Sequence, residues 1–167
     1  KFEKNEKINQ ILITSNTVSS SKIVQKYKFK KIIHQFFPID CNFISRKFIT
    51  HWKPSKVFFV DSEIWPNTIN NLSKKKIPIF LLNGRITKRT LNRWLFFPSF
   101  AQSLFNKFKL CLSSGLETKK YLKKLGAKNI KFLGNLKFSQ SENLSPKLNN
   151  NLKRFIHSKK SWCASST

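Results

Sequence analysis

Seven short apolar runs, separated by segments of helical length, constrain the fold of this chain more than any other feature. The runs are rich in Ile, Val and Phe and nearly continuous rather than alternating, which is typical of strands buried on both faces of a parallel sheet. Their spacing, roughly 20 to 32 residues, leaves room for one crossover helix each time. The sequence therefore predicts a doubly wound α/β fold. The runs cover residues 10–14, 31–35, 56–60, 77–82, 109–112, 129–133 and 162–164.

Helix start and stop signals stand between these runs. Pro66 lies where a first helical turn would begin, because its missing N–H and fixed φ suit that position. Ser114 and Glu117 have the spacing of a capping box, and Gly126 is placed as the C-terminal stop. These signals predict a helix over 116–125 and another beginning at Pro66.

Composition excludes some classes of protein and leaves others open. Of the 167 residues, 40% are hydrophobic and 14% aromatic, which is enough apolar surface to offset the ordering entropy of folding. The composition therefore excludes an intrinsically disordered chain. No uninterrupted apolar run reaches the roughly 18 residues of a transmembrane helix. The chain has no Met and begins at Lys1, so we expect a fragment of a longer protein.

The net charge of +26, from 33 Lys and Arg against 7 Asp and Glu, has two interpretations. The first is that the positive charge serves to bind an anionic partner, such as nucleic acid or a membrane surface. Compositional drift would also produce it, since Lys, Asn, Ile, Phe and Ser are all abundant and the basic residues are spread along the chain. The net charge by itself does not distinguish these two interpretations.

Cysteine and histidine are few and scattered. With no CxxC pair and an odd cysteine count, the sequence predicts neither a disulfide framework nor a zinc site, and we expect no metal and no cofactor. The residues are Cys41, Cys111, Cys163, His34, His51 and His157.

Ligands of open α/β sheets bind beyond the carboxyl ends of the strands, and the first and third runs end in polar loops. Thr17 and Ser21 open the helix after the first run, where hydroxyls can hold an anion or simply cap the helix. Asp61 and Glu63 follow the third run, so two of the 7 acidic residues share one loop. Such a carboxylate can act as general acid or base, or stabilise a cationic transition state, although a helix N-terminus also favours an acid.

The fourth and sixth runs end in glycine next to a cation. Asn83, Gly84 and Arg85 combine a sharp turn with a guanidinium that can grip phosphate or carboxylate. Gly134 and Lys137 follow the sixth run, where an ammonium could hold an anion.

A basic aromatic stretch, residues 88–109, mixes cations with Trp and Phe. This composition suits a surface resting among anionic lipid headgroups, and equally an amphipathic helix pair packed on the sheet. The residues that we predict at the membrane surface are Lys88, Arg89, Arg93 and Trp94.

Taken together, these motifs resemble the Kdo transferases, glycosyltransferases that add 3-deoxy-D-manno-octulosonic acid to the lipid A precursor. The order and spacing of the motifs hold over nearly the whole chain, and EIWPN followed by NGR and GNLKF is a specific combination. The matching stretches are ILITSNTVSSS (11–21), FPID (37–40), DSEIWPN (61–67), KKIPIFLLNGR (75–85), LGAK (125–128), GNLKF (134–138) and WCASST (162–167).

The resemblance implies a GT-B architecture of two Rossmann-like domains, parallel sheets with helices on both faces. Residues 1–138 would be the later part of the N-terminal, acceptor-binding domain. Residues 139–167 would be a linker and the start of the C-terminal domain, which binds the CMP-Kdo donor. The family implies inverting, metal-independent transfer at the cytoplasmic face of the bacterial inner membrane, and a fragment of this extent would be inactive alone.

Site roles follow from the same resemblance. Glu63 and Lys137 match family residues that stabilise the transition state, in which the sugar gains positive charge and the departing phosphate gains negative charge. The acceptor would meet Thr17, Ser21, Asn83 and Arg85, and the donor would meet Ser165, Ser166 and Thr167.

One departure and two alternatives remain. Val18 and Ser20 stand where the family usually shows Pro and Gly, which leaves the details of acceptor binding open. Another GT-B glycosyltransferase acting on a lipid-linked acceptor is one alternative, because the architecture hosts many donors. A basic nucleic-acid-binding domain is the other, although the chain shows no recognisable nucleic-acid motif, so we expect no nucleic-acid partner.

Overall fold

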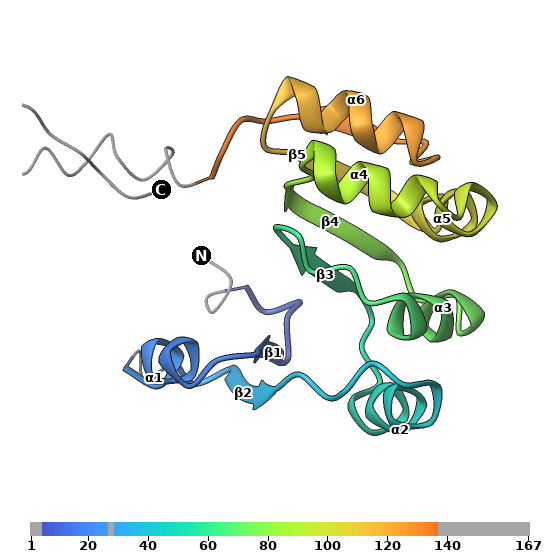
Figure 1. Cartoon of the computed structure of the whole chain (residues 1–167). Coiled ribbons are helices and arrows are strands. Elements are labelled where there is room, and N and C mark those ends of the chain that lie inside the picture. The colour runs from blue at the N-terminus through green and yellow to red at the C-terminus, as the bar shows by residue number, and fades with distance from the viewer. Residues whose placement is uncertain (1–4, 27–28, 137–167) are drawn as a thin grey trace, which may run out of the picture.

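A computed structural model describes residues 5–26 and 29–136 (Figure 1). Six of the seven predicted strands are confirmed to within two residues, and the run at 162–164 lies outside the described residues. The elements are β1 (Ile11–Ser15), α1 (Val18–Lys26), β2 (Ile32–Phe36), α2 (Asn42–Trp52), β3 (Val57–Val60), α3 (Pro66–Lys74), β4 (Ile79–Gly84), α4 (Lys88–Leu95), α5 (Pro98–Phe105), β5 (Phe108–Ser113), α6 (Leu116–Lys124) and β6 (Ile130–Phe132).

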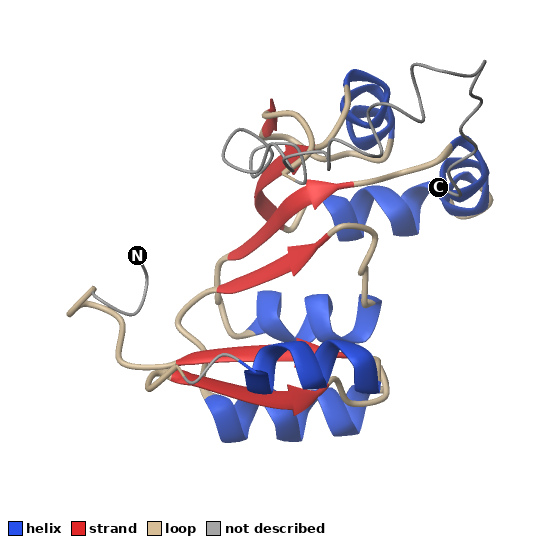
Figure 2. Cartoon of the chain, turned by 90° about the vertical axis from the view of Figure 1, so that its left-hand side faces the viewer, coloured by secondary structure: helices blue, strands red, loops and turns tan. Residues whose placement is uncertain are grey.

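The strands form two parallel sheets, a two-stranded sheet of β1 and β2 and a four-stranded sheet in the order β3-β4-β5-β6 (Figure 2). Every paired strand runs parallel to its neighbour, with helices in the connections, so the α/β class is confirmed. Among the described residues no ladder joins β1 to β3, and the two sheets are linked by side-chain contacts instead.

The hydrophobic core lies between the four-stranded sheet and α3, α4, α5 and α6. Side chains of alternate strand positions, such as Phe59 and Leu81, pack there with Phe105 of α5 and Leu122 of α6. Of the elements before β3, only α2 contributes, through Ile49. The second half of the described chain therefore carries the core.

In the part of the chain that the structure describes, no helix packs on the opposite face of β3. Phe58 and Val60 are 53% and 47% exposed, because successive side chains of a strand point to opposite faces and the core helices pack on only one. The expectation that every strand is buried on both faces is wrong at β3. Phe58 stacks on Phe80 of β4 with ring centroids 5.1 Å apart, so this face is apolar as well as exposed.

Two of the predicted helix signals are confirmed and one is wrong. Pro66 occupies the first turn of α3, and Gly126, with φ of 95°, follows the end of α6. The capping box at α6 is absent, because the Ser114 hydroxyl donates to the carbonyl oxygen of Gly84 at 2.9 Å. Glu117 instead accepts a 2.5 Å hydrogen bond from the Tyr121 hydroxyl, which raises the pKa of Tyr121.

Candidate functional site

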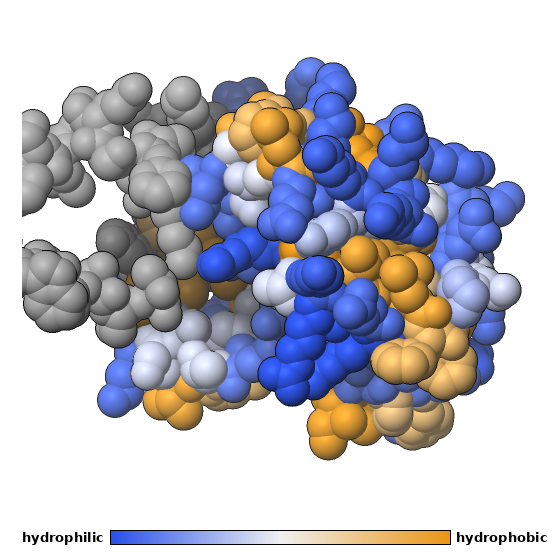
Figure 3. Space-filling view, turned by 45° about the horizontal axis from the view of Figure 1, so that its top comes forward, coloured by the Kyte–Doolittle hydropathy of each residue, from blue (hydrophilic) through white to orange (hydrophobic). Residues whose placement is uncertain are grey.

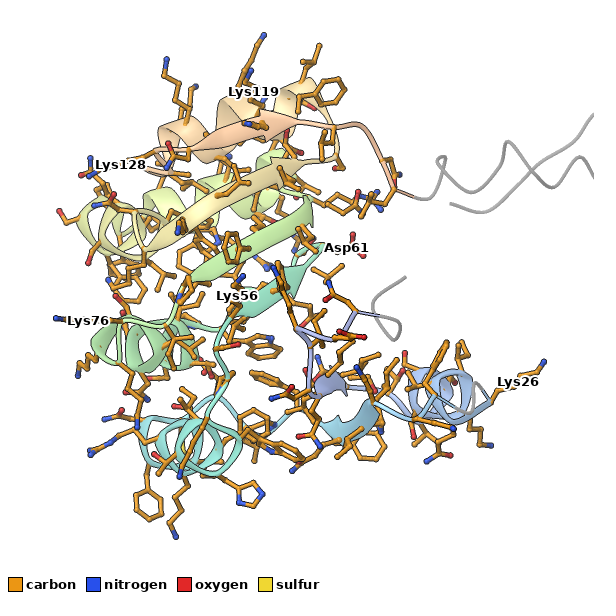
Figure 4. The ribbon with its side chains drawn as sticks, turned by 180° about the vertical axis from the view of Figure 1, so that it is seen from behind. Lys26, Lys56, Asp61, Lys76, Lys119 and Lys128 are labelled. Carbon is orange, nitrogen blue, oxygen red and sulfur yellow. The ribbon has the colours of Figure 1, made fainter. Side chains whose placement is uncertain are left out.

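The carboxyl ends of β3 and β4 remain joined beyond the sheet by hydrogen bonds between their loops. The backbone N–H of Asp61 donates to the carbonyl of Leu82 at 3.0 Å, and that of Arg85 donates to the carbonyl of Asp61 at 3.2 Å. The Ser62 hydroxyl then donates to the Arg85 carbonyl at 2.8 Å. Figure 4 labels Asp61 at this end of β3. The loops after β3 and β4 therefore form one unit.

A side-chain amide lies at the centre of this unit. Asn83 is only 5% exposed, and its amide nitrogen donates to the Asp61 carboxylate. Its amide oxygen accepts a hydrogen bond from the backbone N–H of Leu136 at 3.2 Å. Asp61 and Asn83 both have left-handed backbone conformations, with φ of 58° and 51°. Strain of this kind gathers at functional sites, because only a surrounding structure that over-determines the backbone keeps it.

Glu63 lies two residues further along the loop after β3 and is exposed to solvent. Its carboxylate accepts a hydrogen bond from the Asn16 amide at 3.0 Å, which brings the loop after β1 against the loop after β3. Asn16 stands in the polar loop after the first apolar run, but nothing in the sequence distinguishes it from the other polar residues there as the partner of Glu63. An exposed carboxylate held from one side can face a ligand in the solvent beyond this edge.

Of the two hydroxyls predicted to bind the acceptor, that of Thr17 caps the start of α1. The Thr17 hydroxyl accepts from the backbone N–H of Ser20 at 3.2 Å and lies 2.8 Å from the Ser20 hydroxyl. Ser21 is buried, with 6% of its surface exposed. Helix capping, the simpler of the two interpretations of these residues, therefore describes the contacts of Thr17.

Asp40 holds the start of α3, a role that the sequence analysis missed. Its carboxylate accepts hydrogen bonds from the backbone N–H groups of Asn67 and Thr68 at 3.0 and 2.8 Å, and from the Thr68 hydroxyl at 2.7 Å. Beside it, the rings of Phe37 and Trp65 stack with centroids 5.1 Å apart. The FPID and EIWPN motifs thus meet each other. The unsatisfied N–H groups of α3 signal that an acceptor is needed, but not which residue supplies it.

The basic aromatic stretch divides into a buried and an exposed part. Trp94 is half-buried, stacked on Phe100 with centroids 6.2 Å apart and edge-on to Phe105 at 5.4 Å. Phe96 and Phe97, between α4 and α5, are 77% and 71% exposed. The three cations predicted with Trp94, namely Lys88, Arg89 and Arg93, are all exposed.

Charged side chains elsewhere are dispersed. Lys26, Lys76, Lys119 and Lys128 come from different parts of the fold and point outward in different directions (Figure 4). The face seen in Figure 3 shows apolar patches among hydrophilic ones. The structure thus places basic residues around the periphery rather than on one stripe.

Several predicted site residues cannot be placed. Lys137, Ser165, Ser166 and Thr167 lie outside the described residues.

Within residues 5–26 and 29–136, no group of three His, Cys, Asp or Glu side chains is arranged to hold a metal ion. No helix in the same residues is long and apolar enough to span a bilayer. Cys111 is fully buried, and burial raises the pKa of its thiol to about 12.

Comparison with known proteins gives one consistent family. Residues 1–140 match the family described as 3-deoxy-D-manno-octulosonic-acid transferase (kdotransferase). The 3-deoxy-D-manno-octulosonic acid transferases of Rickettsia felis and Rickettsia conorii are 36% and 37% identical over 134 residues, 80% of this chain. That of Haemophilus influenzae is 24% identical over 135 residues, also 80% of this chain. The matched segments make up 28% of each Rickettsia protein and 32% of the Haemophilus protein.

Proposed function

This chain belongs to the 3-deoxy-D-manno-octulosonic acid (Kdo) transferase family, and from that premise we propose that it serves Kdo transfer from CMP-Kdo to the lipid A precursor in lipopolysaccharide biosynthesis. The family match over residues 1–140 is the observation that carries the proposal. Residues 1–138 are the later part of the acceptor-binding domain, and residues 139–167 lead into the donor-binding domain.

The chemistry of the proposed reaction suits a carboxylate at the edge of the sheet. Breaking the bond between Kdo and CMP leaves positive charge on the sugar and negative charge on the departing phosphate. Glu63, exposed and held by Asn16, stabilises the first charge, and the ammonium of Lys137 stabilises the second. Transfer proceeds with inversion and without a metal ion.

Substrate contacts are proposed for the loops around this edge. Arg85 is exposed beyond β4, where its guanidinium can pair with a phosphate of the acceptor. The same acceptor surface includes Thr17 and Ser21, with Asn83 beneath it as a buried support hydrogen-bonded to Asp61 and Leu136. The donor meets Ser165, Ser166 and Thr167.

The end of α4 is the part of the fold that we propose to contact the membrane. Exposed Phe96 and Phe97 follow α4, which carries exposed Arg89 and Arg93, and this combination of apolar and cationic side chains suits an anionic bilayer interface. With Lys88 and Trp94, these residues hold the enzyme against the cytoplasmic face of the inner membrane, where its lipid acceptor lies.

A transfer assay on the full-length protein tests the activity. Incubation with CMP-Kdo and the lipid A precursor should produce a Kdo-bearing lipid and free CMP, both measured by mass spectrometry. Glu63→Gln should lower kcat by roughly 10²-fold or more, because it keeps the shape but removes the charge. The control Glu6→Gln changes an exposed carboxylate before β1 and should leave kcat unchanged. Absence of transfer by the wild-type protein, or wild-type turnover by Glu63→Gln, contradicts the respective claim.

Vesicle binding tests the membrane surface separately. Replacing Lys88, Arg89 and Arg93 together by Gln should weaken binding to vesicles containing an anionic phospholipid, since each cation contributes about 1 kcal/mol there. A matched control replaces Lys119, Lys120 and Lys123, three exposed lysines of α6, by Gln. Equal losses in the two variants would show that the attraction is a property of the whole charge and not of this surface.

A further inference from the structure

We propose that Asn83 is a positioning residue, whose buried amide ties the loop carrying Glu63 to the segment after β6. The inference rests on the proposed function for the role of Glu63, and it concerns how the fold holds the loop that carries this carboxylate. The contacts of Asn83 carry it.

The amide of Asn83 joins three segments that are far apart in the sequence. Its nitrogen donates to the carboxylate of Asp61, two residues before Glu63. Its oxygen accepts from the backbone N–H of Leu136, one residue before Lys137 in the sequence. Asn83 itself lies near the end of β4. One side chain thereby links the carboxyl end of β3 to the segment after β6, across the width of the four-stranded sheet.

Burial makes this link specific. Asn83 is 5% exposed, so water does not readily replace either hydrogen bond, and an unsatisfied amide there would be costly. The small exposed fraction also leaves little of Asn83 available to a substrate. The side chain is therefore better suited to hold its neighbours than to contact an acceptor.

The backbone of the two residues supports the same conclusion. Asp61 and Asn83 both lie in the left-handed region, with φ of 58° and 51°, and the register between β4 and β5 is irregular between Leu81 and Gly84. Asn and Asp adopt this conformation more readily than most other non-glycine residues, because their short polar side chains hydrogen-bond nearby. The irregular strand end places the amide of Asn83 against Asp61.

Position matters for the reaction because charge stabilisation requires groups that are fixed before the charges develop. A displacement of about 1 Å can lower a rate by about 10²-fold. If Asn83 fixes the loop that carries Glu63, its loss should lower kcat and leave substrate affinity nearly unchanged. A residue that contacts the acceptor would raise KM instead.

Exchanging the two partners tests the link in the full-length enzyme. Asn83→Asp places two carboxylates together, and kcat should fall about tenfold or more, with KM for each substrate within about twofold. The double variant Asp61→Asn/Asn83→Asp restores every hydrogen bond, since Asn at 61 donates to Asp at 83 and Asp at 83 still accepts from Leu136. Its kcat should return to within about threefold of wild type. A single variant with wild-type kcat, a raised acceptor KM, or a double variant that is not rescued overturns the proposal.

A measurement independent of activity separates this inference from the proposed function. In Asn83→Gly, which tolerates the left-handed backbone but lacks the amide, hydrogen exchange at the Leu136 N–H should accelerate about tenfold or more. Unchanged exchange overturns the link even if the enzyme transfers Kdo. Accelerated exchange in a protein that transfers no Kdo supports the link while the proposed function fails.

Discussion

Residues 11–36 and residues 57–132 are both built from parallel strands joined by helices, yet only the second region has a buried core. In the first region Val18 and Ile23 of α1 are 62% and 61% exposed, and Phe36 of β2 is 49% exposed. In the second, Leu81 and Phe105 are completely buried. Two strands with one helix give each apolar side chain few neighbours, whereas four strands with four helices enclose theirs. An apolar run thus predicts a strand in either region, but its burial depends on what packs against it.

The contacts between the two regions lie where the proposed chemistry does. Asn16 of the first region reaches Glu63, and Asp40, in the segment that connects the two regions, holds the start of α3, the helix that follows the Glu63 loop. The weakly packed region therefore touches the strongly packed one through polar groups at the carboxyl edge of its sheet. We infer that the first region positions the Glu63 loop through its polar side chains, while the second region provides the stability of the fold.

The largest difference is expected from truncating an equivalent side chain in each region. Leu81→Ala removes a fully buried side chain and should lower the free energy of unfolding by about 2–5 kcal/mol. Ile33→Ala in β2, where Ile33 is 38% exposed, should cost less than about 1 kcal/mol. Urea denaturation of the two variants measures both. Equal losses would show that the two regions share one core.

Thiol labelling compares the second region with the segment that connects the two regions, without changing their packing. In a Cys163→Ser background, half-buried Cys41 should react readily with a maleimide at pH 8, whereas buried Cys111 should react roughly 10²-fold more slowly. The rate at Cys111 should rise to that of Cys41 once urea unfolds the chain. Fast labelling of native Cys111 would contradict a closed core in the second region.

The same thiol predicts a pH dependence of stability. Burial raises the pKa of Cys111 from 9.0 to about 12, so the unfolded chain releases this proton at lower pH than the folded chain does. The stability that follows from the neutral thiol is complete below pH 9.0 and is lost as the pH rises toward 12. Cys111→Ala should reduce the loss of stability measured between pH 9 and pH 10.5 by roughly 1–2 kcal/mol. An identical pH dependence in both proteins would contradict the prediction.

A smaller effect is expected from breaking the contact between the connecting segment and the second region. Asp40→Ala removes the acceptor for the first N–H groups of α3 and should cost about 1–2 kcal/mol of unfolding free energy. Asp40→Asn keeps one oxygen for the Thr68 N–H, so it should cost less than Asp40→Ala. Thermal unfolding followed by circular dichroism measures both variants. No difference between Asp40→Ala and wild type would mean that water caps α3 equally well.

The order of the strands along the chain and the positions of the polar loops were predictable from the sequence. The runs of Ile, Val and Phe predict strands because their local pattern suits a parallel sheet, and Pro66 and Gly126 mark helix ends through their own backbone restrictions. The position of Glu63 at a carboxyl edge follows from the same pattern. These features depend on a residue and its near neighbours in sequence, so they can be read locally.

Partnerships across the fold were not predictable in this way. Ser114 and Glu117 have the spacing of a capping box, yet the Ser114 hydroxyl bonds to Gly84, 30 residues earlier. Asp40 holds a helix that begins 26 residues later, at Pro66, and nothing in its surroundings in the sequence indicates it. A hydrogen-bonding group takes the partner that the packed chain brings near, and sequence spacing alone does not determine that distance.

The α/β class, the order of the strands along the chain, the family resemblance and the loop proposed to carry a catalytic carboxylate can all be read from the amino-acid pattern. The division of the strands into two sheets, the exposure of one face of β3 among the described residues, and the contacts of Asn83 with Asp61 and Leu136 emerge only in the folded chain. Strand and helix signals arise from local backbone preference and apolar pattern. Burial and hydrogen-bond partners depend on which distant segments pack together.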